Sequence, residues 1–490
     1  MDSEALYKAV KERDARFAGR FFIAVRTTRI YCRPGCPAKT PRRENVEFYQ
    51  SAAAAQSAGF RACMRCRPDA APGSAAQAGT SAVLARALRL LEESGEANGL
   101  ADRLGISDRH LRRLFQQHLG AAPAQVLRTR RLQLARQLLA FSKLPMIDVA
   151  HAAGFQSVRR FNDAIRAAFG RTPTELRAST AEDSAGLLLK LPFRPPLDFE
   201  ALLRFFEPRA LPGVEEVRFG GAGFAGDGAS PRERDLGGAG FAGDGASPKG
   251  RDLGGAWRRT LKEGVLEVRA KGNALEVRLP AVLAPQTLQI AARVTHVFDL
   301  LADPIAIHEH LSRDKVLRPF LRPGLRVPGS WDPFEMAVRS ILGQQITVRG
   351  ARTLAERLVE QYGEKLPHGR LFPTAARLAQ VELTGMPASR AKAVSGLAKA
   401  VASGQVRLDG TQAAEALLTL PGIGDWTAQV IGMRALGEPD AFPAADLGLC
   451  KSLSLTPREL TAHAEKWRPW RATAAAALWL YCGEEHDANR

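Results

Sequence analysis

The stretches YCRPGC, residues 31–36, and CMRC, residues 63–66, decide the fold of the first part of this chain. One cysteine pair has three residues between its members, the other has two, and 26 residues separate the pairs. Two short-spaced pairs suit a tetrahedral Zn²⁺ held by four thiolates, because each pair grips the metal from one turn. The predicted zinc ligands are Cys32, Cys36, Cys63 and Cys66.

The spacing alone leaves the role of the zinc open. Closed four-thiolate sites are usually structural, yet a thiolate on zinc is deprotonated and can also be a nucleophile. A disulfide is the weaker alternative, because the chain has only six cysteines in 490 residues and residues 1–10 lack an apolar secretory segment. We therefore expect a reducing, cytoplasmic setting.

Charge is distributed unevenly along the chain, whose net charge is +18. Residues 1–180 hold 30 Lys and Arg against 15 Asp and Glu, whereas residues 181–490 hold 39 against 36. The basic half is the predicted polyanion binder. Its basic residues are scattered through folded patterns rather than gathered in one run, which favours nucleic acid over an anionic membrane. No apolar run reaches membrane-spanning length, so we expect a soluble protein with no membrane partner.

The pattern predicts a multidomain, mainly α chain with α+β parts. Small-residue linkers at 70–79 and 178–185 separate its first three parts. Two near-identical 17-residue Gly-rich units begin at 220 and 237, and they predict a disordered insertion that cannot bury a core. The predicted parts are a small zinc domain at 1–70, tandem helix-turn-helix units at 81–177, a β-rich domain at 187–300 with the insertion at 220–253, and an all-α domain at 304–486.

Two helix-turn-helix units are predicted in the second part, each with a Gly turn and a Ser N-cap before its second helix. The caps are Ser107 and Ser157. A single unit can be merely structural, but two in tandem within a strongly basic region favour DNA binding. The side chains available to contact bases or phosphates are Arg109, His110, Arg112, Arg113, Arg159, Arg160 and Asn162.

These residues carry two resemblances. Residues 81–177 resemble the AraC-type DNA-binding domain, including GFQS at 154–157 and FGRTP at 169–173. Residues 1–70 resemble the N-terminal domain of the Ada alkylation-response proteins. The matching stretches are FIAVRTT at 22–28, YCRPGC at 31–36, RENVEFY at 43–49 and GFRACMRCRP at 59–68.

The second resemblance implies a chemical role for Cys32. In that family the first cysteine of the first pair irreversibly accepts the methyl group of a methylphosphotriester in DNA. Four thiolates on zinc repel an intact phosphate but not a neutral triester, and methylation removes one negative charge, so DNA binding then tightens. The implied partners are alkylated double-stranded DNA, a promoter operator and RNA polymerase, in a bacterial cytoplasm.

The stretch LPGIGDWTA at 420–428 resembles a helix–hairpin–helix signature. Its Gly422 and Gly424 let backbone N–H groups approach a DNA phosphate at a helix start. Asp446 follows at the spacing where glycosylases of this superfamily carry a catalytic Asp. A lone Asp is more often a helix cap, but its position after the hairpin favours catalysis.

Residues 187–482 resemble the AlkA-like 3-methyladenine DNA glycosylases, with ILGQQI at 341–346 among the matches. The resemblance implies base flipping and hydrolysis of the N-glycosidic bond, with Trp426 and Trp479 in the base pocket and Asp446 stabilising the cationic sugar. Gln345 aligns with a Leu wedge, and Val430 with a pocket Tyr. Trp426 stands where glycosylase-lyases carry a Schiff-base Lys, so we expect a monofunctional enzyme.

Three functional hypotheses remain at this point. The first is a fused sensor, transcription regulator and repair enzyme for alkylated DNA. The second is a regulator of the alkylation response whose glycosylase domain is inactive. The third is a repair enzyme that uses its helix-turn-helix units only as a nonspecific DNA anchor.

Overall fold

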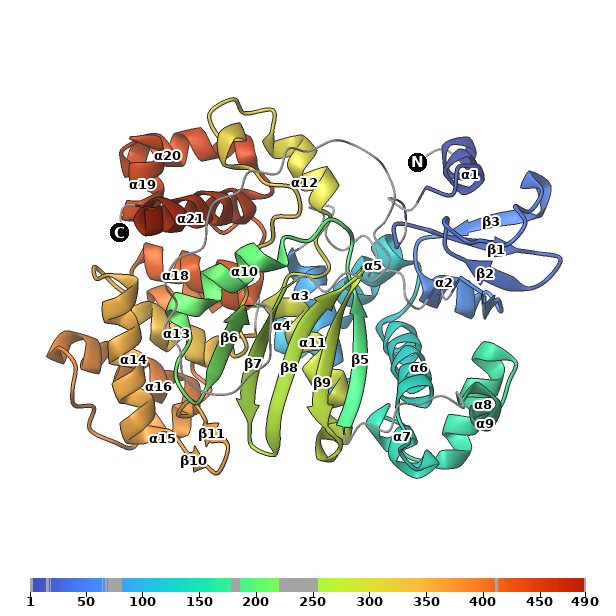
Figure 1. Cartoon of the computed structure of the whole chain (residues 1–490), viewed down its shortest axis with the longest axis horizontal. Coiled ribbons are helices and arrows are strands. Elements are labelled where there is room, and N and C mark those ends of the chain that lie inside the picture. Colours follow the sequence, from blue (N-terminus) through green and yellow to red (C-terminus); the bar gives the residue numbers. More distant parts are fainter. Residues whose placement is uncertain are drawn as a thin grey trace.

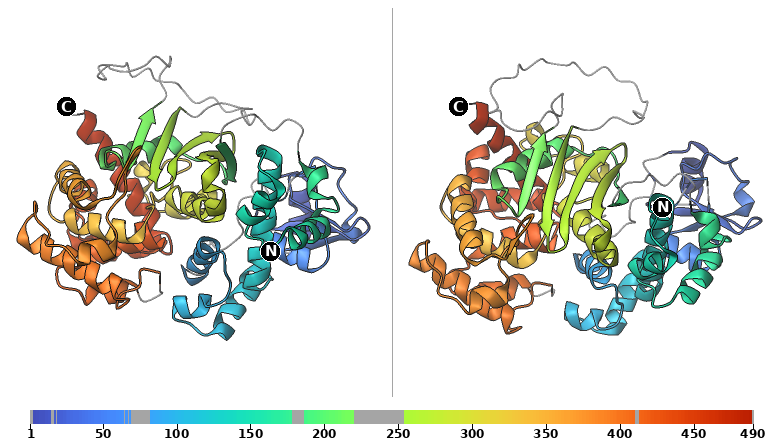
Figure 2. Two further views of the ribbon diagram at one scale, coloured as in Figure 1. Left: turned by 90° about the horizontal axis from the view of Figure 1, so that it is seen from below. Right: turned by 60° about the horizontal axis from the view of Figure 1, so that its bottom comes forward.

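The computed structural model describes residues 3–14, 17, 19–63, 65–66, 68, 82–177, 186–219, 254–409 and 413–488. The parts of the chain follow one another across the molecule (Figures 1 and 2). The N-terminal domain and the helix-turn-helix helices lie on one side of a central sheet, and most of the C-terminal helices lie on the other. The repeat predicted at 220–253 falls outside the described residues.

The N-terminal domain is a small four-stranded sheet of order β3-β1-β2-β4. Strand β2 runs parallel to β4, with Tyr31 opposite Ala62, so the sheet brings the residues after both partners together. Cys32 ends β2, and the amide of Cys63 donates to the Tyr31 carbonyl at 3.0 Å. The elements are α1 (Ser3–Lys11), β1 (Phe22–Val25), β2 (Ile30–Cys32), β3 (Val46–Tyr49), α2 (Ala52–Ser57) and β4 (Arg61–Ala62).

The second region is all helical and contains both predicted helix-turn-helix units. Ser107 and Ser157 cap the second helix of each unit, accepting from the amides of His110 and Arg160 at 3.2 and 3.3 Å. The long helix α6 connects the two units. The helices are α3 (Ala82–Ser94), α4 (Leu100–Leu104), α5 (Asp108–Leu119), α6 (Pro123–Phe141), α7 (Met146–Ala152), α8 (Val158–Phe169) and α9 (Pro173–Leu176).

The central sheet has five strands in the order β5-β9-β8-β7-β6, all paired antiparallel. The hairpin predicted around residues 271–273 is present, with Gly272 at φ +58° in its turn. The strands are β5 (Gly186–Pro192), β6 (Glu215–Phe219), β7 (Gly255–Leu261), β8 (Gly264–Lys271) and β9 (Ala274–Pro280), and the flanking helices are α10 (Phe199–Phe206) and α11 (Thr287–Val297).

The C-terminal region is helical apart from a short hairpin of β10 (Lys365–Leu366) and β11 (Gly369–Arg370). Helix α18 continues directly into a π-helical turn, η7 (Gly432–Leu436). No described helix is long and apolar enough to cross a membrane. The helices are α12 (Pro304–Leu311), α13 (Pro333–Leu342), α14 (Val348–Tyr362), α15 (Ala375–Ala379), α16 (Ala388–Ala402), α17 (Ala413–Leu418), α18 (Asp425–Ile431), α19 (Leu447–Leu453), α20 (Pro457–Ala464) and α21 (Arg471–Ala488).

The regions are packed against one another rather than strung on linkers. One apolar cluster joins residues of the N-terminal sheet, α6 to α8, the central sheet and α11. Polar contacts cross the same boundary: the Lys190 amide donates to Gln137 at 3.0 Å, and the Thr287 hydroxyl donates to the Ala152 carbonyl at 3.2 Å. The predicted fold class, multidomain and mainly α with α+β parts, is therefore confirmed.

Candidate functional sites

The four predicted zinc ligands lie together. Their sulfur atoms all fall within 4.8 Å of one another, and each side chain is between 2 and 7% exposed. A tetrahedron with Zn–S bonds of about 2.3 Å places its sulfurs about 3.8 Å apart, so the donor set fits one zinc ion. The predicted zinc site is thus confirmed at Cys32, Cys36, Cys63 and Cys66.

The thiols affect one another strongly. Hydrogen bonding to Cys36 and then to Cys66, followed by burial, raises the pKa of the Cys32 thiol. The thiol of Cys32 is also the main cause that lowers the pKa of Cys36, since it donates to that sulfur. Buried thiolates this close repel one another, so the sulfurs need a divalent cation if all are to be ionised together.

A cleft of about 770 Å³ opens on the zinc site and is lined by Cys32, Cys36 and Cys63. Its other wall comes from the end of α8, where Gly170 and Arg171 follow the helix. The cleft therefore lies between the N-terminal domain and the second helix-turn-helix unit. The basic side chains in its lining are Lys39, Arg42, Arg61, Arg65 and Arg171. This arrangement suits a ligand that carries phosphate oxygens.

The predicted DNA-contacting side chains lie on the second helices of the two units, α5 and α8. His110 is half-buried, and the other six are exposed. The opposite faces of both helices are buried, with Leu111 and Phe115 on α5 and Phe161 and Ile165 on α8. Packing therefore fixes each helix and leaves its basic face available for DNA.

In the C-terminal region, Asp446 is the N-cap of α19 and is half-buried. Its Oδ1 accepts from the amides of Gly448 and Leu449 at 3.0 and 3.2 Å. Its Oδ2 accepts from the indole Nε1 of Trp426 at 2.9 Å. The amides at the helix N-terminus fix one carboxylate oxygen, and the indole fixes the other. The cap and catalytic interpretations of Asp446 are thus compatible.

Trp426 and Trp479 pack against the same apolar cluster and are both half-buried. Trp479 also stacks on Phe205 of α10, with 6.3 Å between ring centroids and 30° between planes. The guanidinium of Arg209 lies 3.9 Å from the Phe205 centroid. Burial, then Arg339, lowers the pKa of Arg209 to about 10, while the Asp446 carboxylate opposes this shift. The sequence did not identify Phe205 and Arg209 as neighbours of Trp479. The stretch FEALLRFF at 199–206 has the pattern of any amphipathic core helix, and Arg209 follows it without a motif of its own.

The hairpin glycines have different surroundings. Gly422 has φ +85°, and a Cβ built there would lie 2.7 Å from the Ala393 Cβ. Gly424 caps α18 with an extended backbone and has open space where a Cβ would stand. The Gln344 amide donates to the Gly422 carbonyl and the Thr427 hydroxyl, both at 2.9 Å. This links the hairpin to the loop that holds Gln345.

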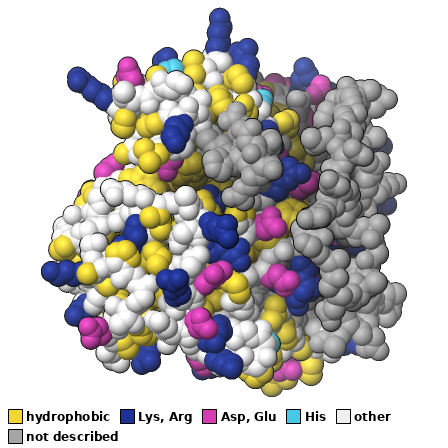
Figure 3. All heavy atoms as spheres, turned by 60° about the vertical axis from the view of Figure 1, so that its left-hand side comes forward, with side chains coloured by type: hydrophobic (Ala, Val, Ile, Leu, Met, Phe, Trp, Pro, Cys, Tyr) yellow, Lys and Arg dark blue, Asp and Glu magenta, His cyan; other side chains and the backbone are white. Residues whose placement is uncertain are grey.

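Gln345 projects from that loop, being exposed with a left-handed backbone at φ +55°. Figure 3 brings the α13–α18 side of the molecule forward. On this face, hydrophobic side chains gather along a furrow between the upper and lower parts of the molecule, with Lys and Arg on both sides. A mixed apolar and basic surface of this kind suits a nucleic acid whose bases are partly unstacked.

Four family models match the chain in order: the metal binding domain of Ada at residues 5–69, a helix-turn-helix domain at 100–179, the AlkA N-terminal domain at 188–332, and the HhH-GPD superfamily of base excision DNA repair proteins at 338–465. The helix-turn-helix and base excision repair matches indicate that DNA is a partner of this chain. The resemblances noted for the Ada-type, helix-turn-helix and AlkA-like regions are thus confirmed.

Three relatives match all or part of this order. The chain is 36% identical over 228 residues to DNA-3-methyladenine glycosylase 2 of Escherichia coli, covering 44% of this chain and 79% of that protein. It is 42% identical over 132 residues to the bifunctional transcriptional activator/DNA repair enzyme Ada of the same organism, covering 26% of this chain and 36% of that protein. It is 40% identical over 522 residues to a probable bifunctional transcriptional activator/DNA repair enzyme AlkA of Mycobacterium tuberculosis, covering 100% of this chain and 98% of that protein. The chain therefore belongs to the family of AlkA-type bifunctional transcriptional activator/DNA repair enzymes.

Proposed function

We propose that this chain senses methylphosphotriesters in DNA at Cys32 and removes alkylated bases, 3-methyladenine among them, at Asp446. The observation that carries the second activity is the carboxylate of Asp446, held between the α19 N-terminus and the Trp426 indole beside the hairpin. The first activity is supported by the basic cleft over the four cysteines. We propose that the working units are residues 1–70, 81–177, 187–300 and 304–486.

In the methyl transfer, the Cys32 sulfur attacks the methyl carbon of the triester. A sulfur–carbon bond forms as the carbon–oxygen bond breaks, and the phosphate keeps the electron pair as a diester anion. Bound zinc supplies the charge that keeps the four sulfurs ionised. Arg61 and Arg171 from opposite walls of the cleft would hold the phosphate oxygens.

After the transfer, the site has one negative charge fewer. Repulsion between the sulfurs and the DNA backbone falls, so the basic faces of α5 and α8 bind DNA more tightly. Contacts to an operator would come from Arg109, His110, Arg112, Arg113, Arg159, Arg160 and Asn162. We further propose that the bound chain contacts RNA polymerase at a promoter and acts in the cytoplasm.

In base excision, the hairpin amides around Gly422 and Gly424 hold a phosphate while Gln345 enters the gap left by the flipped nucleotide. Trp426 and Trp479 stack on the alkylated base. As the bond from the sugar to the base breaks, Asp446 stabilises the positive charge on the sugar and directs a water to it. Trp426 offers no amine, so no imine with the sugar forms.

One experiment tests both activities. The full chain is incubated with methylated duplex DNA, then released bases are quantified and the protein is mapped by mass. We expect free 3-methyladenine, together with a gain of about 14 Da on Cys32, because a methyl group takes the place of the thiol proton. Asp446→Asn should abolish base release and keep the adduct. No release by the unsubstituted chain would support a regulator with an inactive glycosylase domain, and an adduct elsewhere would refute the role of Cys32.

A further inference from the structure

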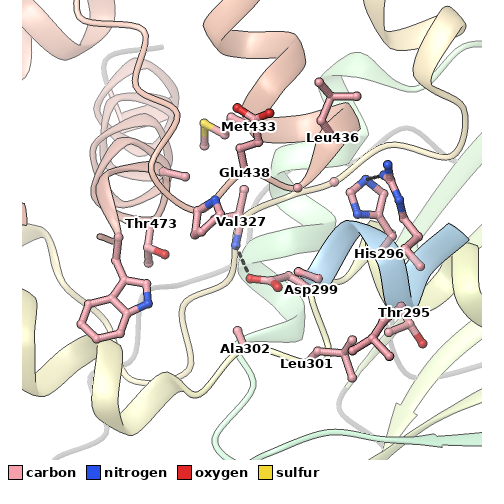
Figure 4. Close-up of a pocket in the computed structure, with 18 of the residues that line it drawn as sticks. Thr295, His296, Asp299, Leu301, Ala302, Val327, Met433, Leu436, Glu438 and Thr473 are labelled. Atoms are coloured by element: carbon pink, nitrogen blue, oxygen red, sulfur yellow. Dashed lines mark hydrogen bonds between the residues drawn. The ribbon is translucent and has the colours of Figure 1, made fainter. Parts of the chain in front are cut away.

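Helix α3 of the helix-turn-helix region docks on the glycosylase region. Leu84, Leu88 and Leu91 of this helix belong to a buried cluster against which Leu288 of α11 also packs. A small cavity of about 120 Å³ remains between them, lined by Leu88 and Arg89 on one side and by α11 and residues around Glu438 on the other. Figure 4 shows His296 beside the blue ribbon of α3, with Leu436 and Glu438 across the cavity.

Two arginines of α3 reach across this boundary. Arg86, only 3% exposed, forms an ion pair with Glu438, whose side chain is 25% exposed. Arg89 Nη1 donates to the Ala435 carbonyl. Each arginine therefore satisfies a group of the glycosylase region with a charged donor, in a place where water has little access.

The contacts fall on the end of the π-helical turn η7. The last carbonyls of a helix lack partners within the helix and carry partial negative charge, so donors from outside stabilise them. Arg89 takes the Ala435 carbonyl, and His296 Nε2 lies 3.0 Å from the Arg434 carbonyl. Burial, then the neighbouring Arg89 charge, lowers the pKa of His296 to about 3, so this ring is neutral and donates.

The segment held by α3 connects the two parts of the proposed catalytic pair. Trp426 lies on α18, which continues directly into η7, and Asp446 follows eight residues after Glu438. The amide of Glu438 donates to the Gly432 carbonyl at 2.9 Å, and the amide of Phe442 donates to Gln429 of α18 at 3.0 Å. A shift at residues 434–438 therefore moves the Asp446 loop relative to α18.

We propose that Arg86 and Arg89 are positioning residues of the glycosylase, which hold residues 434–438 and thereby set the place of Asp446 against Trp426. The inference rests on the proposed function, because it takes Asp446 as the catalytic carboxylate. Base excision by this chain thus depends on a helix that belongs to its transcription-regulating part. A displacement of about 1 Å at a reacting group can cost about 100-fold in rate, so small losses of order are measurable.

The test is single-turnover release of 3-methyladenine from methylated duplex DNA by the full chain, as a function of enzyme concentration. Arg86→Met and Arg89→Met should each lower the maximal rate about tenfold or more, with less than a twofold change in the half-saturating concentration. Arg86→Lys should recover part of the rate, since it restores the charge. Methylation of Cys32 should proceed as in the unsubstituted chain.

Arg103→Met is the matched control, because Arg103 forms another ion pair between the same regions, with Asp409 at 3.0 Å, and this partner is not one of residues 434–438. We expect it to keep the maximal rate within twofold. The double variant Arg86→Met with Glu438→Met should be no slower than Arg86→Met alone, because the two residues act as one pair.

Three results would count against the inference. Unchanged maximal rates in both Arg86→Met and Arg89→Met would refute the positioning role but not the proposed function. An equal loss of rate in Arg103→Met would do the same, because it would indicate general loosening of the interface. An unsubstituted chain that releases no base would refute the proposed function and the positioning role together. Should Arg86→Met lower the melting temperature, Arg89→Met decides the outcome, because it leaves the Glu438 ion pair intact.

Discussion

Alanine at the two glycines of the hairpin is predicted to have different consequences for stability. Gly422→Ala places a Cβ 2.7 Å from the Ala393 Cβ in a backbone with φ +85°. The left-handed conformation costs a non-glycine residue about 1–2 kcal/mol. The close contact with Ala393 on α16 adds to this cost, so we expect a loss of about 2–3 kcal/mol in the stability of the C-terminal region.

Gly424→Ala is the matched control. Its extended backbone accepts alanine, and a Cβ there meets open space. The loss of glycine at an N-cap costs less than about 1 kcal/mol. The same open space is where a DNA phosphate would approach, so this variant should stay folded but bind DNA about tenfold less tightly. Gly422→Ala should lose both stability and DNA binding, since its hairpin is displaced.

The assays are chemical denaturation of the full chain, followed by tryptophan fluorescence, and fluorescence anisotropy with a duplex that contains an abasic-site analogue. The midpoint of the transition that reports the C-terminal region should fall for Gly422→Ala and stay near the unsubstituted value for Gly424→Ala. Equal midpoints for the two variants would refute the steric reasoning. Full DNA affinity in Gly424→Ala would refute the phosphate approach at the hairpin.

Three further predictions concern other regions. The pKa of His296 is lowered to about 3 from its ordinary value near 6.5, so the unfolded chain binds the proton first and stability falls as pH drops from about 6.5 toward 3. Between pH 7 and pH 5, thermal melting of His296→Gln should therefore show a smaller loss of stability than that of the unsubstituted chain. Equal losses in the two proteins would contradict this. Removal of zinc by a chelator should stop methyl transfer but leave base release unchanged, and continued methyl transfer without the metal would oppose the zinc-thiolate mechanism. Cys450→Ser should still bind one zinc per chain, as measured by elemental analysis. Arg171→Met should slow methyl transfer several-fold, whereas Arg166→Met, at an exposed position on α8 itself, should not. Equal rates would exclude Arg171 from phosphate binding.

Local chemistry is what the sequence predicts well. Ser107 and Ser157 cap helices because a hydroxyl followed by a helical pattern satisfies a free amide, and this needs no distant partner. The cysteine pairs meet because each pair is one turn and the metal needs both. The position of Asp446 at a helix start also follows from its own neighbours.

Contacts between segments that are distant in the sequence could not be predicted from it. Phe205 and Arg209 lie on and after α10, more than two hundred residues before Trp479, and nothing in their local pattern shows which aromatic ring they meet. The positive charge of Arg86 and Arg89 counted toward a predicted polyanion-binding half. In the structure these two side chains bind a carboxylate and a carbonyl of the glycosylase region. Total charge thus overstated the basic surface available to DNA.

The uneven distribution of charge still indicates different tasks for the two halves of the chain. Residues 1–180 carry twice as many basic as acidic residues, whereas residues 181–490 are close to balance. Long-range attraction to the DNA backbone therefore comes mainly from the half that holds Cys32, α5 and α8. Because α3 fixes that half to the glycosylase region, DNA held by the first half keeps the second at a high local concentration on the same duplex. We therefore expect the nearly neutral glycosylase region to recognise damage through stacking and the hairpin, and to bind undamaged DNA only weakly.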